Sequence, residues 1–140
     1  MNWLGWSLLS AVFAGATAVL AKAGVEGVNS NVATAIRTTV VLVFAWLVAV
    51  PGLRTTALAS LGQRTWIFLI ASGVATGLSW LCYFRALQLG EASRVAPVDK
   101  LSVVIAIVLA MLFLGERLTL RGGIGAALMV AGVLVLALDR

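Results

Sequence analysis

The chain has few of the residues on which catalytic and metal sites depend. Its 140 residues include no histidine, a single cysteine and five acidic residues. Neither a zinc site nor a Ser/His/Asp triad can be assembled from this set. Charged residues make up 11% of the chain, whereas an ordinary soluble domain has about a quarter. The composition therefore excludes a water-soluble core and predicts no enzymatic activity, no metal and no cofactor.

Acidic charge is scarcer than basic charge, and the ten lysines and arginines give a formal net charge of +5. These basic residues are scattered singly along the chain and form no cluster. A nucleic-acid-binding protein would concentrate them in a stripe or patch. We therefore expect no nucleic acid partner, and we expect the basic residues to lie where helices meet the membrane surface.

What the chain has in abundance is hydrophobic sequence, 62% of its residues. The apolar runs do not alternate with polar residues as the strands of a membrane barrel do, so we expect membrane-spanning helices. The loops are too short for a soluble domain, and we predict one membrane domain over residues 1–140. Five spans are predicted, at about residues 3–22, 31–51, 65–87, 94–114 and 120–138.

An odd number of spans puts the two ends of this polypeptide on opposite sides of the bilayer. Basic residues normally fix the orientation by their excess on the cytoplasmic side. Here they divide almost evenly, which leaves either insertion open. Four lie on the side of the N-terminus (Arg54, Arg64, Arg117 and Arg121) and six on the other (Lys22, Arg37, Arg85, Arg94, Lys100 and Arg140).

The second half of the chain carries a recognisable series of motifs. Tyr83-Phe84-Arg85-Ala86-Leu87 is followed by the stretch 90–98, which ends in Ala96-Pro97-Val98, and then by Leu-Gly-Glu-Arg-Leu-Thr at 114–119. This series resembles the EamA-type repeat of the drug/metabolite transporter superfamily, in its five-helix, single-repeat class. The resemblance implies an all-α membrane protein that forms one half of an inverted-repeat transporter. It also implies a small-molecule transporter in a prokaryotic inner membrane that works as an antiparallel homodimer by alternating access.

Charges at membrane depth cost about 2.5–3.5 kcal/mol each on insertion scales, so each needs a reason. Arg37 is either a cation facing a cavity or a side chain that reaches back to the membrane surface. Lys22 has the same two interpretations. Asp99 and Lys100 follow Pro97, which is expected to bend the helix. These two charges either line the cavity or form a structural ion pair at the helix end.

Aromatic residues in the third predicted span add to this set. Gly73, Thr76, Gly77, Trp80 and Phe84 share a helix face, with Tyr83 beside it, and aromatic rings with polar edges suit a substrate cavity. Ordinary helix packing is the alternative. The residues selected as cavity-lining are Arg37, Trp80, Tyr83, Asp99, Lys100 and Lys22.

The last predicted span carries small residues at regular helical spacing. Gly125, Met129, Gly132 and Leu136 recur at intervals of four, three and four, and we refer to these residues as the glycine seam. Small residues allow helices to approach closely in lipid. The seam predicts a close helix–helix contact, and the resemblance implies that this last helix makes the dimer contact; packing within one chain is the alternative.

Two other functions fit the same sequence. The chain could be an accessory membrane subunit that requires a similar but distinct partner, or a carrier of lipid-linked molecules. Evenly divided basic residues favour the homodimer over the accessory subunit.

The even division of basic residues predicts dual insertion. Reporters fused to the C-terminus, one active in the cytoplasm and one outside the membrane, should both give signals. A signal from only one side would contradict the inverted pair.

Overall fold

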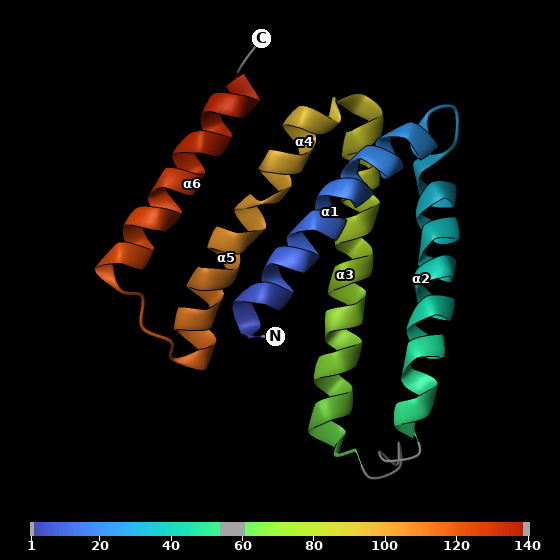
Figure 1. The fold of residues 1–140 in the computed structure, drawn as a ribbon, viewed down its shortest axis with the longest axis horizontal. Helices are drawn as coiled ribbons and strands as arrows, with labels where there is room; N and C mark the ends of the chain where they lie inside the picture. The colour runs from blue at the N-terminus through green and yellow to red at the C-terminus, as the bar shows by residue number, and fades with distance from the viewer. Residues whose placement is uncertain (1, 54–60, 139–140) are drawn as a thin grey trace. The chain divides into compact units, whose positions relative to one another are not determined.

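A computed structural model describes residues 2–53 and 61–138, and these residues are helical apart from short turns (Figure 1). Arg54 and Arg140, which were counted in the charge tally, lie outside the described residues. The elements in order are α1 (Trp3–Val25), α2 (Ser30–Leu53), α3 (Gln63–Leu89), α4 (Ala92–Asp99), α5 (Leu101–Leu109), a π-helical turn (Ala110–Leu114) and α6 (Leu120–Leu138).

Five helical segments of the described chain are long and apolar enough to cross a membrane. They are Trp3–Val25, Ser30–Gly52, Gln63–Leu89, Ala92–Leu114 and Leu120–Leu138. The prediction of an all-α protein with five spans is therefore confirmed. The main difference at the helix ends is in α1, which continues past Lys22 to Val25.

Side chains at the predicted turns start two of the helices. The Asn31 N–H donates to Asn29 Oδ1 at 2.9 Å, just before α2. The Gly122 N–H donates to Thr119 Oγ1 at 3.1 Å, just before α6. Each bond satisfies an N–H group that has no partner inside its helix. These caps set where the two spans begin.

The fourth span is not one continuous α-helix, because α4 ends at Asp99 and α5 begins at Leu101. Around this break the backbone tightens to three-residue hydrogen bonds, from Lys100 N–H to the Pro97 carbonyl and from Val103 N–H to the Lys100 carbonyl, both 3.0 Å. Pro97 has no N–H to donate, and its ring crowds the preceding turn. Both effects act on the turn before Pro97, so they do not account for the interruption at Lys100, three residues after the proline.

The span ends in the π-helical turn, which the sequence did not predict. Gly115 stops it with a φ of 68°, a left-handed conformation that glycine adopts without steric cost. The Glu116 N–H then donates to the Ala110 carbonyl at 3.3 Å. A glycine at this position lets the chain leave the membrane and return through α6.

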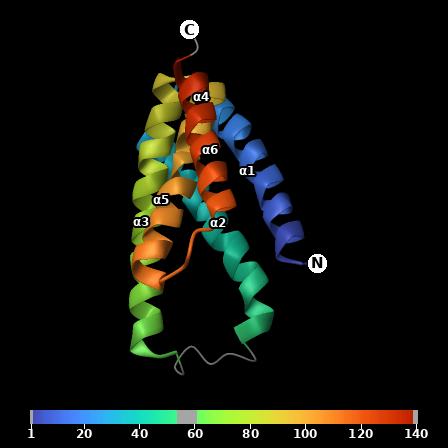
Figure 2. The same cartoon turned by 90° about the vertical axis from the view of Figure 1, so that its left-hand side faces the viewer.

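The chain divides into two compact units, residues 1–22 with 89–140 and residues 23–88. In the first unit α6 contacts α4 and α5 and runs back alongside them (Figures 1 and 2). In the second unit α2 and α3 are joined at one end, where Gln88 Nε2 donates to the Val28 carbonyl. The assignment of residues 1–140 to one domain stays a prediction.

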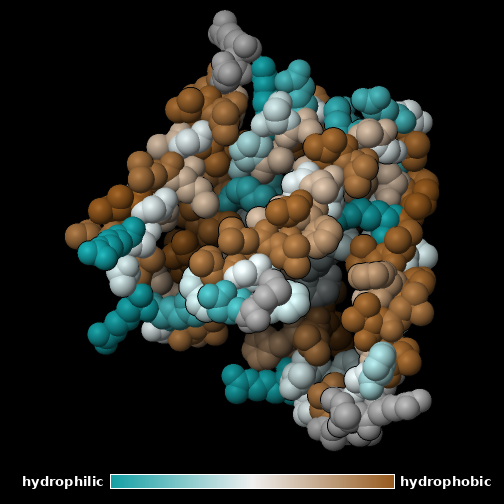
Figure 3. Space-filling view, viewed as in Figure 1, coloured by the Kyte–Doolittle hydropathy of each residue, from teal (hydrophilic) through white to brown (hydrophobic). Residues whose placement is uncertain are grey.

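Few side chains are buried within the described chain. The hydrophobic ones are Ala18, Ala21, Val25, Phe84, Leu87 and Val133. No more than 6% of any spanning window is buried, and hydrophobic side chains cover much of the face shown in Figure 3. The helices therefore present most of their apolar surface outward, where lipid or another protein must cover it.

Candidate functional site

Arg37 stacks on aromatic side chains of α3. Its guanidinium carbon lies 4.3 Å from the centroid of the Trp80 ring and 5.5 Å from that of Phe84. These distances are within the range of cation–π attraction, about 6 Å. We call Arg37, Trp80 and Phe84 the arginine stack.

The rings come together because Trp80 and Phe84 are one helical turn apart on α3. Phe84 is 3% exposed, and Tyr83 meets it edge-on with ring centroids 6.5 Å apart. Phe84 was on the predicted aromatic face but was not selected as a site residue, and its spacing of four from Trp80 was the available signal.

Stacking offsets part of the cost of placing a cation in the membrane. A partly desolvated cation–π contact contributes about 1 kcal/mol, against an insertion cost of about 2.5–3.5 kcal/mol. Within residues 2–53 and 61–138, no carboxylate forms an ion pair with Arg37. The aromatic rings stabilise the charge of Arg37 but do not neutralise it.

Threonines next to Arg37 satisfy their own hydroxyl groups. Thr34 Oγ1 donates to the Ser30 carbonyl at 2.8 Å, and Thr38 Oγ1 donates to the Thr34 carbonyl at 2.7 Å. Hydroxyls that bond one turn back along their own helix do not require water. These donors are therefore compatible with a dry as well as a wet surface around Arg37.

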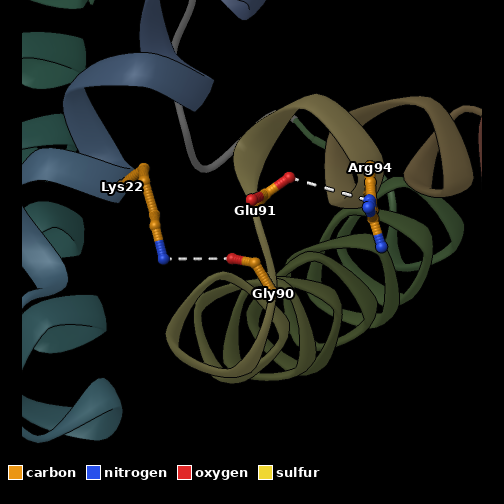
Figure 4. A network of polar contacts seen from close by, with 4 residues as sticks. All are labelled: Lys22, Gly90, Glu91 and Arg94. Atoms are coloured by element: carbon orange, nitrogen blue, oxygen red, sulfur yellow. Dashed lines mark hydrogen bonds and ion pairs between the residues drawn. The ribbon is translucent and has the colours of Figure 1, made fainter. Parts of the chain in front are cut away.

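Lys22 fastens the end of α1 to the turn between α3 and α4 (Figure 4). Its Nζ donates to the Gly90 carbonyl at 3.0 Å. In the same turn Arg94 Nε lies 3.6 Å from Glu91 Oε2. Lys22 thus has a structural contact that the sequence did not reveal, because Gly90 is 68 residues away.

Asp99 pairs with its neighbour Lys100, with Lys100 Nζ and Asp99 Oδ2 3.2 Å apart. The pair lies at the break between α4 and α5. This geometry is that of the structural ion pair considered above. Lys22, Asp99 and Lys100 belong to one unit and Arg37, Trp80 and Tyr83 to the other, so a common cavity stays a prediction.

The glycine seam of α6 is on an uncovered face. Gly125, Met129, Gly132 and Leu136 are all exposed, and a Cβ added at Gly125 or Gly132 would meet no atom within 4 Å. Beyond its first turn, where Gly122 and Gly123 are partly buried, the partly or fully buried residues of α6 form a different stripe. We call it the inward stripe, and it consists of Ala126, Val130 and Val133.

The inward stripe recurs at spacings of four and three, and α6 contacts α4 and α5. Val133 is only 6% exposed. Another glycine, Gly122, lies close to its own chain, since an added Cβ would be 2.8 Å from Leu118 Cδ1. α6 therefore has one face packed within the chain and a separate small-residue face left open.

A model of the EamA-like transporter family matches residues 1–138. The chain belongs to this family. That confirms the resemblance drawn from the motifs at 83–87, 90–98 and 114–119. The family is one of membrane transporters.

Relatives of this EamA-like chain differ in length. A Sinorhizobium protein named "uncharacterized transporter in cobO 3'region" is 53% identical over 137 residues, which cover 97% of this chain and 96% of that protein. The Bacillus subtilis (strain 168) "uncharacterized transporter YxxF" is 26% identical over 136 residues, 96% of this chain but only 42% of that protein. No solved structure matches the chain significantly.

The arginine stack predicts an energetic coupling between Arg37 and Trp80. A double-mutant cycle with Arg37→Met and Trp80→Leu should give a coupling of about 1 kcal/mol in the free energy of unfolding, since a partly desolvated cation–π contact falls in that range. Unfolding of the purified protein in detergent, followed by circular dichroism, measures it.

The matched control is Arg64 and Phe68, where the guanidinium carbon is 5.7 Å from the ring centroid and Phe68 is 63% exposed. Coupling in this pair should be smaller. Equal coupling in both pairs, or none at Arg37 and Trp80, would contradict the stack.

Proposed function

We propose that the chain exports or imports small molecules across a prokaryotic inner membrane as an antiparallel homodimer that works by alternating access. Membership of the EamA-like family and the bacterial relatives support a transporter in such a membrane. In this proposal the helices before α6 in both copies enclose a central cavity. Its lining includes Arg37, Trp80, Tyr83, Lys22, Asp99 and Lys100.

The number of spans supports an inverted pair. Five helices are long and apolar enough to cross a membrane, and a chain that crosses the bilayer five times has its two ends on opposite sides. A second copy inserted the other way would complete a pseudo-symmetric pair, as inverted repeats do within longer transporters. The nearly even division of basic residues leaves both insertions accessible.

The lengths of the relatives also support a pair of copies. The Sinorhizobium transporter is matched over 96% of its length, so a protein of this size carries the name transporter by itself. More than half of the Bacillus subtilis transporter lies outside the match. Two copies of this chain would together approach the length of the longer protein but not reach it, since the 136 matched residues are 42% of that protein.

The single observation that carries the dimer proposal is the open face of α6. The glycine seam is exposed, with free space over both of its glycines, while the inward stripe already supplies the packing within the chain. In lipid, close van der Waals contact between small residues is a main source of helix association. We assign the glycine seam to the contact between the two copies.

Bulky residues in the glycine seam should separate the copies. Gly125→Leu and Gly132→Leu together should shift the purified protein from dimer to monomer, since each overpacked position costs about 1–3 kcal/mol. Leucine also favours helix over glycine by roughly 1 kcal/mol, so a weakened helix would not explain the loss. Light scattering after size-exclusion chromatography gives the oligomeric state.

Ala131→Leu is the matched control, because Ala131 is exposed on another face of α6. This variant should stay dimeric. A wild-type monomer, or a dimer unaffected by both glycine substitutions, would refute the assignment of the seam.

A further inference from the structure

The contacts that stabilise the charge of Arg37 are with two aromatic rings of α3. Trp80 and Phe84 face the guanidinium carbon, and no acidic residue in the described parts of the chain pairs with it. A guanidinium group carries five N–H donors around its edge. Among the described residues, no hydrogen bond or ion pair joins this N–H edge of Arg37 to another group of the chain, so it is available to a ligand.

We infer that Arg37, held by Trp80, binds the oxyanion of the transported molecule through this N–H edge. The ligand class is a small organic anion with a carboxylate or phosphate group next to an apolar body. Arginine binds both groups with paired, charge-assisted hydrogen bonds. The inference rests on the proposed transport function for the role of the site, and it adds the class of substrate.

Arg37 and Trp80 lie at a position along their helices that a transported molecule would pass. Arg37 is seven residues from the start of α2 at Ser30, and Trp80 nine from the end of α3 at Leu89, which correspond to about 10 and 14 Å of helix. Those two ends lie together, since Gln88 bonds to the Val28 carbonyl. Both residues are therefore at a similar distance from the same end of the helix pair. The 24 residues of α2 and 27 of α3 exceed a hydrocarbon layer of about 30 Å by only a few Å at each end, so both residues lie within that layer.

The stack also argues against simple snorkelling. A snorkelling arginine extends along its own helix toward water and the headgroups. Arg37 instead contacts rings on a neighbouring helix, one of which is 3% exposed. The side chain is thus held in place before any ligand arrives, and such preorganisation favours binding.

The apolar part of the ligand follows from the neighbours. Trp80 and Tyr83 are partly exposed beside Arg37, and an aromatic ring or short alkyl chain can pack on them. A bare inorganic anion would leave this surface unused. Benzoate and phenyl phosphate are therefore suitable probes, with benzamide as the uncharged counterpart of benzoate.

The experiment uses the full-length protein in nanodiscs of phosphatidylcholine, with binding measured by calorimetry. Benzoate and phenyl phosphate should bind, and benzamide should not. Arg37→Gln should weaken benzoate binding by about tenfold or more, the effect of losing one charge-assisted bond. Arg37→Lys keeps the positive charge but lacks the planar guanidinium group. Its affinity for benzoate should therefore lie between those of the wild-type protein and Arg37→Gln.

Arg85→Gln is the control for general loss of positive charge. Arg85 lies on α3, is exposed, and donates through Nη1 to Gln88 Oε1 at 3.0 Å. Its substitution should leave benzoate affinity unchanged. Equal binding of benzoate and benzamide, or unchanged binding in Arg37→Gln, would overturn the inference.

Lipid phosphate has the same chemistry as a soluble anion, so a second set of nanodiscs contains phosphatidylglycerol. Benzoate affinity that is insensitive to this lipid supports a soluble substrate. Competition by phosphatidylglycerol that disappears in Arg37→Gln would show a lipid site and overturn the substrate assignment. If the protein is a monomer and binds benzoate through Arg37, the homodimer is refuted and the anion site is not. If the protein is a dimer and does not bind benzoate, the anion site is refuted and the homodimer is not.

Discussion

The hydrocarbon of a bilayer offers no hydrogen-bonding partner, so every polar group in a span must find one within protein. This constraint explains most of the described contacts. Threonine hydroxyls bond to carbonyls one turn back, Lys22 bonds to the Gly90 carbonyl, and Asp99 pairs with Lys100. Arg37 differs from these groups, because aromatic rings stabilise its charge and do not neutralise it.

The same constraint gives α6 its two faces. Its inward stripe contacts the helices of its own unit, and its glycine seam has no protein atoms over the glycines. Lipid is a poor match for a surface with glycines seven residues apart, because its chains gain little contact there. A second copy of the same helix can interlock with it. This is the physical basis on which one five-span chain becomes half of a transporter.

Much of the fold follows from the sequence, because span length and apolar composition are local properties. The five spans were predictable from runs of hydrophobic residues, and the residues that cap α2 and α6, Asn29 and Thr119, are of types that favour helix starts. The interruption of the fourth span lies at Lys100 and not at Pro97, where the sequence predicted a bend, and a proline acts mainly on the turn before it. The π-helical turn has no signature in the sequence.

The candidate site was less accessible to sequence reasoning. Periodicity placed Trp80 and Phe84 on one face of α3, but nothing local could join them to Arg37 on α2. The contact between Lys22 and Gly90 likewise depends on how the chain returns. Contacts between side chains that are far apart in the sequence can be identified only from the tertiary structure. The face of a helix on which a residue lies can be predicted from the sequence.

The central claim is that two copies pair head to tail through α6, and cysteine cross-linking tests it most directly. In a Cys82→Ser background, single cysteines are placed at Met129, the middle of α6, and at Leu136 near its end. Antiparallel pairing predicts a disulfide-linked dimer for Met129→Cys and none for Leu136→Cys, whose two copies would be about 20 Å apart along the helices. Efficient cross-linking of Leu136→Cys to itself would indicate parallel copies and contradict the account.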